Sequence, residues 1–312
     1  MDAPSARAPV TPLGHPGRHQ EPSGQSAALA GIGLMVFGLF LFSVNDTLGK
    51  WLVATYSVGQ ILLIRSLAAL VCLAPFWRRG GLAPFRDAPR PGLQLARIAL
   101  ATLEVAFFYW AVSLLPLADV MTYYLAGPIY VTALSALMLG ERITLRRGLA
   151  VLVGFAGVLV VLRPTAASFT LPALIALGGS LFFAFMMITT RMLRGTHDTV
   201  LVTGQTLGAL VLGAVLAPLA WAPPTGRDLA LLALLGVVSL GAHVCVNRSL
   251  KLAPASVVVP FQYTLLIWAV VFGYLVFGES PKTATLAGAA IIVAAGLFIF
   301  FDERRGAGGT GT

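Results

Sequence analysis

The segment Leu114–Glu141 reads LLPLADVMTYYLAGPIYVTALSALMLGE, and Leu252–Glu279 reads LAPASVVVPFQYTLLIWAVVFGYLVFGE. The two segments align at an offset of 138 residues, so the chain contains an internal repeat. The identical pairs at this offset include Pro116 with Pro254, Gly140 with Gly278, and Glu141 with Glu279. Upstream, Lys50 corresponds to Arg191, and each ends its apolar run. The chain therefore consists of two related halves.

The composition predicts that both halves lie in a membrane. Of the 312 residues, 58% are hydrophobic and 11% are charged, whereas soluble domains average about 45–50% apolar and about 25% charged. A single soluble core cannot bury so much apolar surface, and the same excess excludes intrinsic disorder. Cys72 and Cys245 lie within apolar runs, which indicates small buried side chains and no disulfide or metal site. The net charge of +9 fits cytoplasmic loops better than nucleic-acid binding.

Ten apolar runs have the length of a membrane-spanning helix, which needs about 20 residues. The runs cover 27–48, 56–77, 93–113, 117–139, 145–163, 170–190, 199–221, 228–247, 254–277 and 284–301. Residues 1–26 are rich in Pro, Gly and Ser and are expected to form a disordered cytoplasmic tail, and 303–312 a second tail. The expected domains are a first five-helix repeat over 27–163 and a second over 170–302.

The distribution of Lys and Arg predicts the orientation. With the N-terminus inside, 16 of these residues, Arg97 among them, fall on the cytoplasmic side and four on the other, while Arg65 lies within a span. Both termini are therefore expected in the cytoplasm. Because five spans is an odd number, the second half is inverted relative to the first. The predicted fold class is an all-α membrane protein with ten transmembrane helices as two inverted five-helix repeats, which is typical of secondary transporters.

The sequence resembles the EamA family of the drug/metabolite transporter superfamily, bacterial type, over roughly residues 27–302. The resemblance depends on the ten short spans, the two blocks that end in Gly-Glu, PFQYTLLIWAVVFGYLVFGE at 260–279, and Arg65 in the second span. It implies a metabolite or drug carrier whose central cavity is lined by spans 1, 3, 4, 6, 8 and 9. Within the family, VNDTLGKWL at 44–52 and GQILLIRSL at 59–67 look most like uptake permeases for S-adenosylmethionine or riboflavin.

Two charged residues lie at membrane depth, where a charge costs about 2.5–3.5 kcal/mol on insertion scales. Arg65 is in the second span, where it binds an anionic group of a substrate or forms a structural ion pair. Glu104 is in the middle of the third span. It is a candidate for proton coupling or for binding a cationic group, and the alternatives are a permanent pair with Arg65 or a protonated core acid.

Two further pairs of polar residues are spaced four apart on a helix, so each pair shares a face. Asp46 and Lys50 close the first span, as an ion pair at the outer interface or as a gate. His243 and Asn247 share a face of the eighth span. His243 is either a satisfied core histidine or part of a proton relay.

Prolines in matching regions of the fourth and ninth spans predict interrupted helices, which often mark a transporter's binding site. Near Pro128 and Pro260, the side chains expected to line the cavity are Tyr124, Gln262 and Tyr263. Their rings fit a planar organic solute, and the alternative is packing at the interface with lipid.

Glu141 and Glu279 each follow a glycine at a helix end. They are interpreted as hairpin caps near the positive end of the next helix.

The function that the sequence favours is a secondary transporter that moves a small organic metabolite across the cytoplasmic membrane by alternating access, with proton coupling left open. The alternatives are an exporter of amino acids or drug-like compounds and a membrane-embedded enzyme. No HExxH, GxSxG or P-loop motif supports an enzyme or an ATP-driven pump. The expected partners are the substrate and the lipid bilayer, without cofactor, metal or nucleic acid, and a homodimer is left open.

Overall fold

The computed structural model describes residues 24–278 except 82, 116 and 163–169, and in the last segment positions 283, 287, 288, 290, 291, 293–295, 297, 298 and 301. Most of the two expected tails, Glu279 and part of the tenth apolar run lie outside the described residues. The first helix begins at Gly24, so it includes the last three residues that were assigned to the N-terminal tail.

The described chain forms helices and contains no strand. The helices are α1 (Gly24–Val53), α2 (Val58–Gly80), α3 (Ala83–Arg86), α4 (Pro91–Leu114), α5 (Leu117–Tyr124), α6 (Gly127–Leu139), α7 (Leu145–Leu162), α8 (Leu171–Met192), α9 (Asp198–Leu216), η2 (Ala217–Leu219), α10 (Gly226–Leu252), α11 (Ala255–Val258), η3 (Val259–Tyr263) and α12 (Thr264–Phe277). Seven helical stretches of the described part are long and apolar enough to cross a membrane: Ser26–Val53, Val58–Arg78, Pro91–Leu114, Leu171–Met192, Asp198–Leu219, Gly226–Leu252 and Ala255–Val276. The protein is therefore an all-α, multi-pass membrane protein.

Large apolar side chains cover the outside of the helix bundle. Leu137 and Leu145, for example, are 82% and 79% exposed, while the polar side chains of Gln60 and Arg97 are 0% and 1% exposed. So many exposed large apolar side chains are not typical of a protein in water. In a bilayer these leucines face lipid tails, and the polar groups find their partners inside the protein.

Two of the expected spans are interrupted, as the prolines predicted. The fourth span consists of α5 and α6, separated by a turn at Leu125 and Ala126, with Pro128 in the first turn of α6. The ninth consists of α11, the 3₁₀ helix η3 with Pro260, and α12. Proline has no backbone N–H to donate, so the regular helical hydrogen bonding ends beside it.

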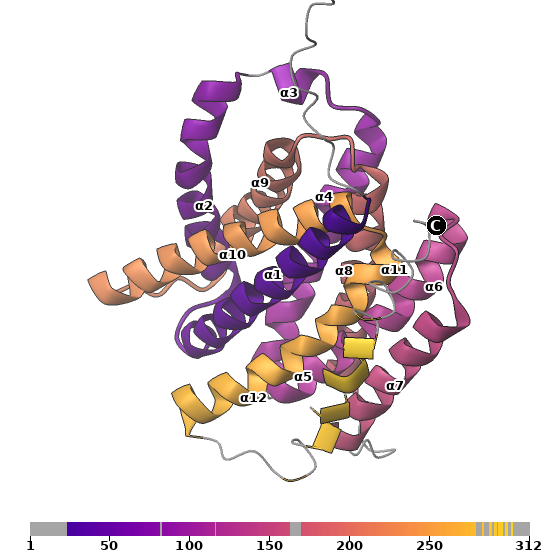
Figure 1. Ribbon diagram of the computed structural model, residues 1–312. Helices are drawn as coiled ribbons and strands as arrows, with labels where there is room; N and C mark the ends of the chain where they lie inside the picture. Colours follow the sequence, from indigo (N-terminus) through magenta and orange to yellow (C-terminus); the bar gives the residue numbers. More distant parts are fainter. Residues whose placement is uncertain are drawn as a thin grey trace, which may run out of the picture.

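Three helix pairs form the centre of the bundle: α1 packs against α10, α4 against α8, and α2 against α9. Smaller contacts join α2 to α10, α4 to α9, α6 to α8, and α1 to α12. Figure 1 shows the indigo α1 beside the orange α10, with α2 on one side of the bundle and α6 and α7 on the other. The first and second halves of the chain are thus interleaved.

Glycines bring the backbones of α2 and α9 into direct contact. A Cβ atom on Gly59 would lie 2.5 Å from the backbone carbon of Leu216, and one on Gly213 would lie 2.5 Å from the backbone nitrogen of Leu63. No side chain fits between these atoms. Close approach of this kind is how transmembrane helices associate without a hydrophobic driving force.

We expect Gly213→Ala to destabilise the protein, because the added methyl group overlaps the α2 backbone and the helices must separate. Overpacking of this kind costs about 1–3 kcal/mol. Thermal unfolding of the detergent-purified variant measures the loss. Gly226→Ala is the matched control, since nothing lies within 4 Å of a Cβ atom there. Equal transition midpoints for the two variants would contradict the predicted contact.

Candidate functional site: a cavity between the halves

A cavity lies between α1, α4, α5, α8, α10 and the η3–α12 segment, and α2 adds one side chain to its wall. Its charged, amide and imidazole lining consists of Asn45, Asp46, Arg65, Glu104, His243 and Gln262. Its aromatic lining consists of Phe42, Phe108, Tyr109, Tyr124 and Phe183. The six spans that the family resemblance implied all line this cavity. Two of its walls come from the interrupted helices, because Tyr124 ends α5 and Gln262 lies in η3.

A second hollow adjoins the first and extends between α2, α4, α9 and α10. The two share Arg65, Glu104, Val105 and His243 as lining residues. Three titratable side chains from three different helices therefore stand where the hollows meet. This junction is the candidate site for binding and coupling.

The structure gathers most of the predicted site residues in one place. Arg65, Glu104, Tyr124, His243 and Gln262 all line the cavity. They come from α2, α4, α5, α10 and η3, so only the tertiary fold brings them together.

Asp46, predicted as half of an interfacial pair or gate, also belongs to the cavity wall. Lys50 lies one turn further along α1 and is not among the residues that line the cavity.

Two further predicted residues, Tyr263 and Asn247, lie outside the cavity lining. The Tyr263 hydroxyl donates a hydrogen bond to the Val151 carbonyl at 3.0 Å, and the ring packs against Leu125 and Leu266. In a 3₁₀ helix, successive side chains point about 120° apart, so Gln262 lines the cavity while Tyr263 contacts α7. Asn247 is 1% exposed and accepts a hydrogen bond from Arg97, one turn beyond His243.

Arg65 is held by neutral partners. Its Nη1 donates to the Tyr109 hydroxyl at 3.0 Å and its Nη2 donates to Ser239 Oγ at 2.5 Å. The guanidinium carbon lies 5.7 Å from the centre of the Tyr109 ring. Among the described residues, no carboxylate oxygen lies within 4.0 Å of Arg65. A direct ion pair between Arg65 and Glu104, one of the alternatives above, is therefore not formed in this structure.

The two carboxylates of the cavity are also without a basic partner. Asp46 is 9% exposed, and its Oδ1 accepts a hydrogen bond of 3.3 Å from Asn45 Nδ2. Tyr124 donates to the backbone carbonyl of Glu104 at 3.3 Å. In the described part of the chain, no Lys, Arg or His nitrogen lies within 4.0 Å of either carboxylate. Buried acids without a cation bind a proton or a positively charged ligand readily.

One ring nitrogen of His243 takes part in hydrogen bonding, and the other has no hydrogen-bond partner among the described residues. Its Nδ1 lies 2.8 Å from the Ser239 backbone carbonyl, and its ring meets that of Phe42 edge-on at 4.8 Å between centroids. A carbonyl oxygen only accepts, so Nδ1 carries the proton in the neutral ring. Nε2 is then an acceptor, available to a donor group on a solute.

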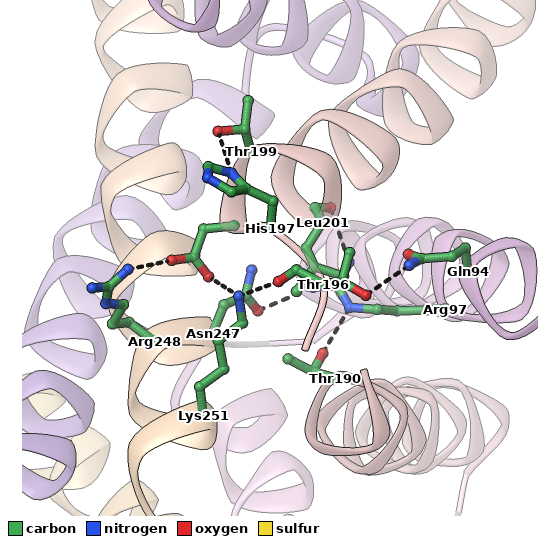
Figure 2. A network of polar contacts seen from close by, with 11 residues as sticks. Gln94, Arg97, Thr190, Thr196, His197, Thr199, Leu201, Asn247, Arg248 and Lys251 are labelled. Atoms are coloured by element: carbon green, nitrogen blue, oxygen red, sulfur yellow. Dashed lines mark hydrogen bonds and ion pairs between the residues drawn. The ribbon is translucent and has the colours of Figure 1, made fainter. Parts of the chain in front are cut away.

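The structure contains a buried arginine that sequence reasoning missed as a site residue. Arg97 is 1% exposed, and four hydrogen bonds tie it to three other helices; those to Thr190, Leu201 and Asn247 can be followed in Figure 2. Its partners are Thr190 Oγ1 at 2.7 Å, the Leu201 carbonyl at 3.0 Å, Gln205 Oε1 at 2.9 Å and Asn247 Oδ1 at 3.0 Å. The count of charges by side grouped Arg97 with the cytoplasmic residues, whereas the structure buries its side chain inside the bundle. The available signal was its position within the apolar run 93–113.

Glu141 is a cap, but of a different helix from the one expected. Its two carboxylate oxygens accept the backbone N–H groups of Ala255 and Ser256, at 3.1 and 3.0 Å, at the start of α11. Arg191 pairs with the same carboxylate at 3.5 Å and donates to the Leu250 carbonyl at the end of α10. The expectation of a cap on the next helix along the chain is corrected, because Glu141 joins the first half of the chain to the second. Gly140 and Gly278 both have a positive φ, 65° and 68°, which favours glycine at this position of the repeat.

A second polar cluster lies beside the Glu141 contact. It joins the start of α9 to the end of α10. Asp198 pairs with Arg248 at 2.9 Å and with Lys251. Lys251 also donates to the Thr196 carbonyl, and Gln94 donates to the Thr196 hydroxyl at 2.9 Å, so α4 joins the cluster (Figure 2). These bonds hold the helix ends together on one face of the protein.

Among the described residues, no three His, Cys, Asp or Glu side chains lie close enough together to hold a metal ion. The thiols of Cys72 and Cys245 are free and half-buried on α2 and α10.

Comparison with known proteins agrees with this architecture. The pattern of the EamA-like transporter family matches residues 29–163 and again residues 170–301. A solved structure with 20% sequence identity superposes with a TM-score of 0.74, over 90% of this chain and 100% of the other, and shows the shared fold.

Curated relatives of this chain are bacterial transporters. A pseudopaline exporter, CntI, of Pseudomonas aeruginosa is 30% identical over 271 residues, which span 85% of this chain and 94% of the relative. A riboflavin transporter of Rhizobium johnstonii is 30% identical over 285 residues, 90% of this chain and 94% of the relative. An S-adenosylmethionine uptake transporter of Rickettsia felis is 25% identical over 280 residues, 89% and 94%. With its family pattern present twice over most of its length and its helices packed around a polar cavity, the chain belongs to the EamA-like transporter family.

Proposed function

We propose that this protein is a secondary carrier of the bacterial cytoplasmic membrane, which moves a small organic metabolite by alternating access. The observation that carries the proposal is the cavity in which Arg65, Glu104 and His243 meet between the two halves of the chain. Charged groups inside a membrane protein are expensive and mark substrate or ion pathways. Interrupted helices at such a site are typical of secondary carriers.

The proposed architecture is ten transmembrane helices as two inverted repeats, with both termini in the cytoplasm. Under a two-fold relation between the halves, α1 corresponds to α8, α2 to α9 and α4 to α10. The α1–α10 contact then becomes α8–α4, the α2–α10 contact becomes α9–α4, and α2–α9 is unchanged. All of these contacts exist in the bundle, which supports a two-fold relation between the halves.

We propose cofactor-like metabolites as substrates, with uptake of S-adenosylmethionine or riboflavin as the first candidates. Relatives with these activities match 89% and 90% of the chain. Export is the second candidate, because the pseudopaline exporter is as similar as the riboflavin transporter, at 30% identity.

Transport into proteoliposomes tests the proposal. A panel of metabolites that includes S-adenosylmethionine, riboflavin and amino acids is offered with and without an imposed pH gradient, and the lumen is analysed by mass spectrometry. We expect one compound to enter above the level in protein-free liposomes. Accumulation that needs the gradient assigns proton coupling, with Glu104 and His243 as the first residues to mutate.

Equilibration without the gradient assigns facilitated diffusion or exchange and leaves both residues with structural roles. If no compound moves although the protein is folded, the carrier proposal is overturned.

A further inference from the structure

Three hydrogen-bond acceptors lie on one wall of the cavity, contributed by α1 and α4: the carboxylates of Asp46 and Glu104 and the amide oxygen of Asn45. Asn45 is 5% exposed, and its Oδ1 has no hydrogen-bond partner among the described residues. The Asn45 Nδ2 donates to Asp46 Oδ1. With the amide nitrogen used in this bond, the amide oxygen is the atom left to accept.

Among the described residues, no Lys, Arg or His nitrogen forms a direct ion pair with either carboxylate of this wall. Arg65 lines the same cavity, but its guanidinium is bonded to Tyr109 and Ser239 and lies more than 4.0 Å from both carboxylates. His243 donates from Nδ1 to a backbone carbonyl, which leaves Nε2 as a further acceptor. A buried acceptor without a donor is unfavourable, and more so if it is charged, so a ligand that supplies donors and a positive charge is stabilised on binding.

Aromatic rings complete the surroundings. Phe108 and Tyr124 meet edge to face at 5.3 Å between centroids, and Phe183 lies 6.3 Å from Tyr124. The faces of aromatic rings attract cations, and their area suits a flat ring on the ligand.

We propose that this wall is a subsite for a primary ammonium group of the substrate, with Asp46, Glu104 and Asn45 Oδ1 as its acceptors. Three acceptors match the three N–H donors of an ammonium group. The carbon skeleton next to the ammonium group packs against Phe108, Tyr124 and Phe183. The inference rests on the proposed carrier function, because it assigns the chemistry of the transported molecule.

The test compares two probes that differ in their charged group. Phenethylamine carries a phenyl ring and an ammonium group, and 3-phenylpropionate carries the same ring and a carboxylate. Binding to the purified full-length protein in lipid nanodiscs is measured by calorimetry. We expect phenethylamine to bind at least about tenfold more tightly, and Asp46→Asn and Asn45→Leu each to weaken it about tenfold or more. Asp87→Asn is the matched control, since Asp87 is exposed and outside this cavity.

Equal binding of the two probes, or unchanged phenethylamine binding in a folded Asp46→Asn variant, would overturn the subsite. Loss of phenethylamine binding in sodium chloride but not in potassium chloride would assign the acceptors to a sodium ion and also overturn it. Because binding is measured without transport, the two proposals fail separately. Discrimination between the probes without transport of any metabolite overturns the carrier, and transport without discrimination overturns the ammonium subsite.

Discussion

Arg97→Ala is expected to abolish the folded protein. The side chain joins α4 to α8, α9 and α10 through four hydrogen bonds of 2.7–3.0 Å. Alanine removes the donor from the buried amide oxygens of Gln205 and Asn247 and leaves a cavity in place of the guanidinium. Each buried group without a partner costs about 1–3 kcal/mol, and the total stability of a protein is only about 5–15 kcal/mol. The loss at the two oxygens, together with the cavity, is therefore a large fraction of the total stability.

Size-exclusion chromatography of a fluorescent-protein fusion, extracted in mild detergent, measures the effect as the height of the monodisperse peak. Arg97→Lys should retain an intermediate yield, because lysine keeps the charge but lacks the planar fork that reaches partners on three helices. Arg86→Ala is the control, since Arg86 ends the short helix α3 and is exposed. A wild-type peak for Arg97→Ala would contradict the structural role assigned to these bonds.

Removing both Arg65 and Glu104 is expected to lower the transport rate at least as much as removing either one. Arg65→Ala and Glu104→Gln should each lower the initial transport rate of the compound found in the proteoliposome panel by about 30-fold or more, since losing a buried charged contact to a ligand costs about 2–5 kcal/mol. Arg65 donates to Tyr109 and Ser239 rather than to Glu104. The double variant should therefore show no recovery.

The measurement is a double-mutant cycle on transport, with folding of each variant verified by size-exclusion chromatography. Arg86→Ala again serves as the control. If the double variant transports faster than either single variant, the two residues act as a mutual ion pair during the cycle, and the assignment of separate roles is wrong.

Features that depend on one segment could be predicted from the sequence. Helix positions follow from apolar runs, and the interruptions near Pro128 and Pro260 follow from the missing N–H of proline. Arg65 and Glu104 stood out because charges at membrane depth need a cavity or a partner, and both line the cavity.

Features that depend on how helices are rotated or paired could not be predicted. The 3₁₀ geometry of η3 decides that Gln262 faces the cavity and Tyr263 faces α7. A count of charges by side cannot separate Arg97, which enters the bundle, from arginines in loops. The cap made by Glu141 is on α11, more than a hundred residues away, and no local pattern identifies a partner at that distance.

The glycine contact between α2 and α9 has a thermodynamic consequence for the alternating-access cycle that we propose. Exchange of the halves keeps α2 and α9 as partners, so a contact between these two helices that is retained in both forms contributes equally to both and cancels from their difference. Close packing at Gly59 and Gly213, where it is retained, then strengthens the whole protein without favouring either form. The bias between the forms must come from contacts that the exchange does not preserve, such as the pairing of Asp198 with Lys251. Stability and resting population are thereby set by different residues and can change independently in evolution.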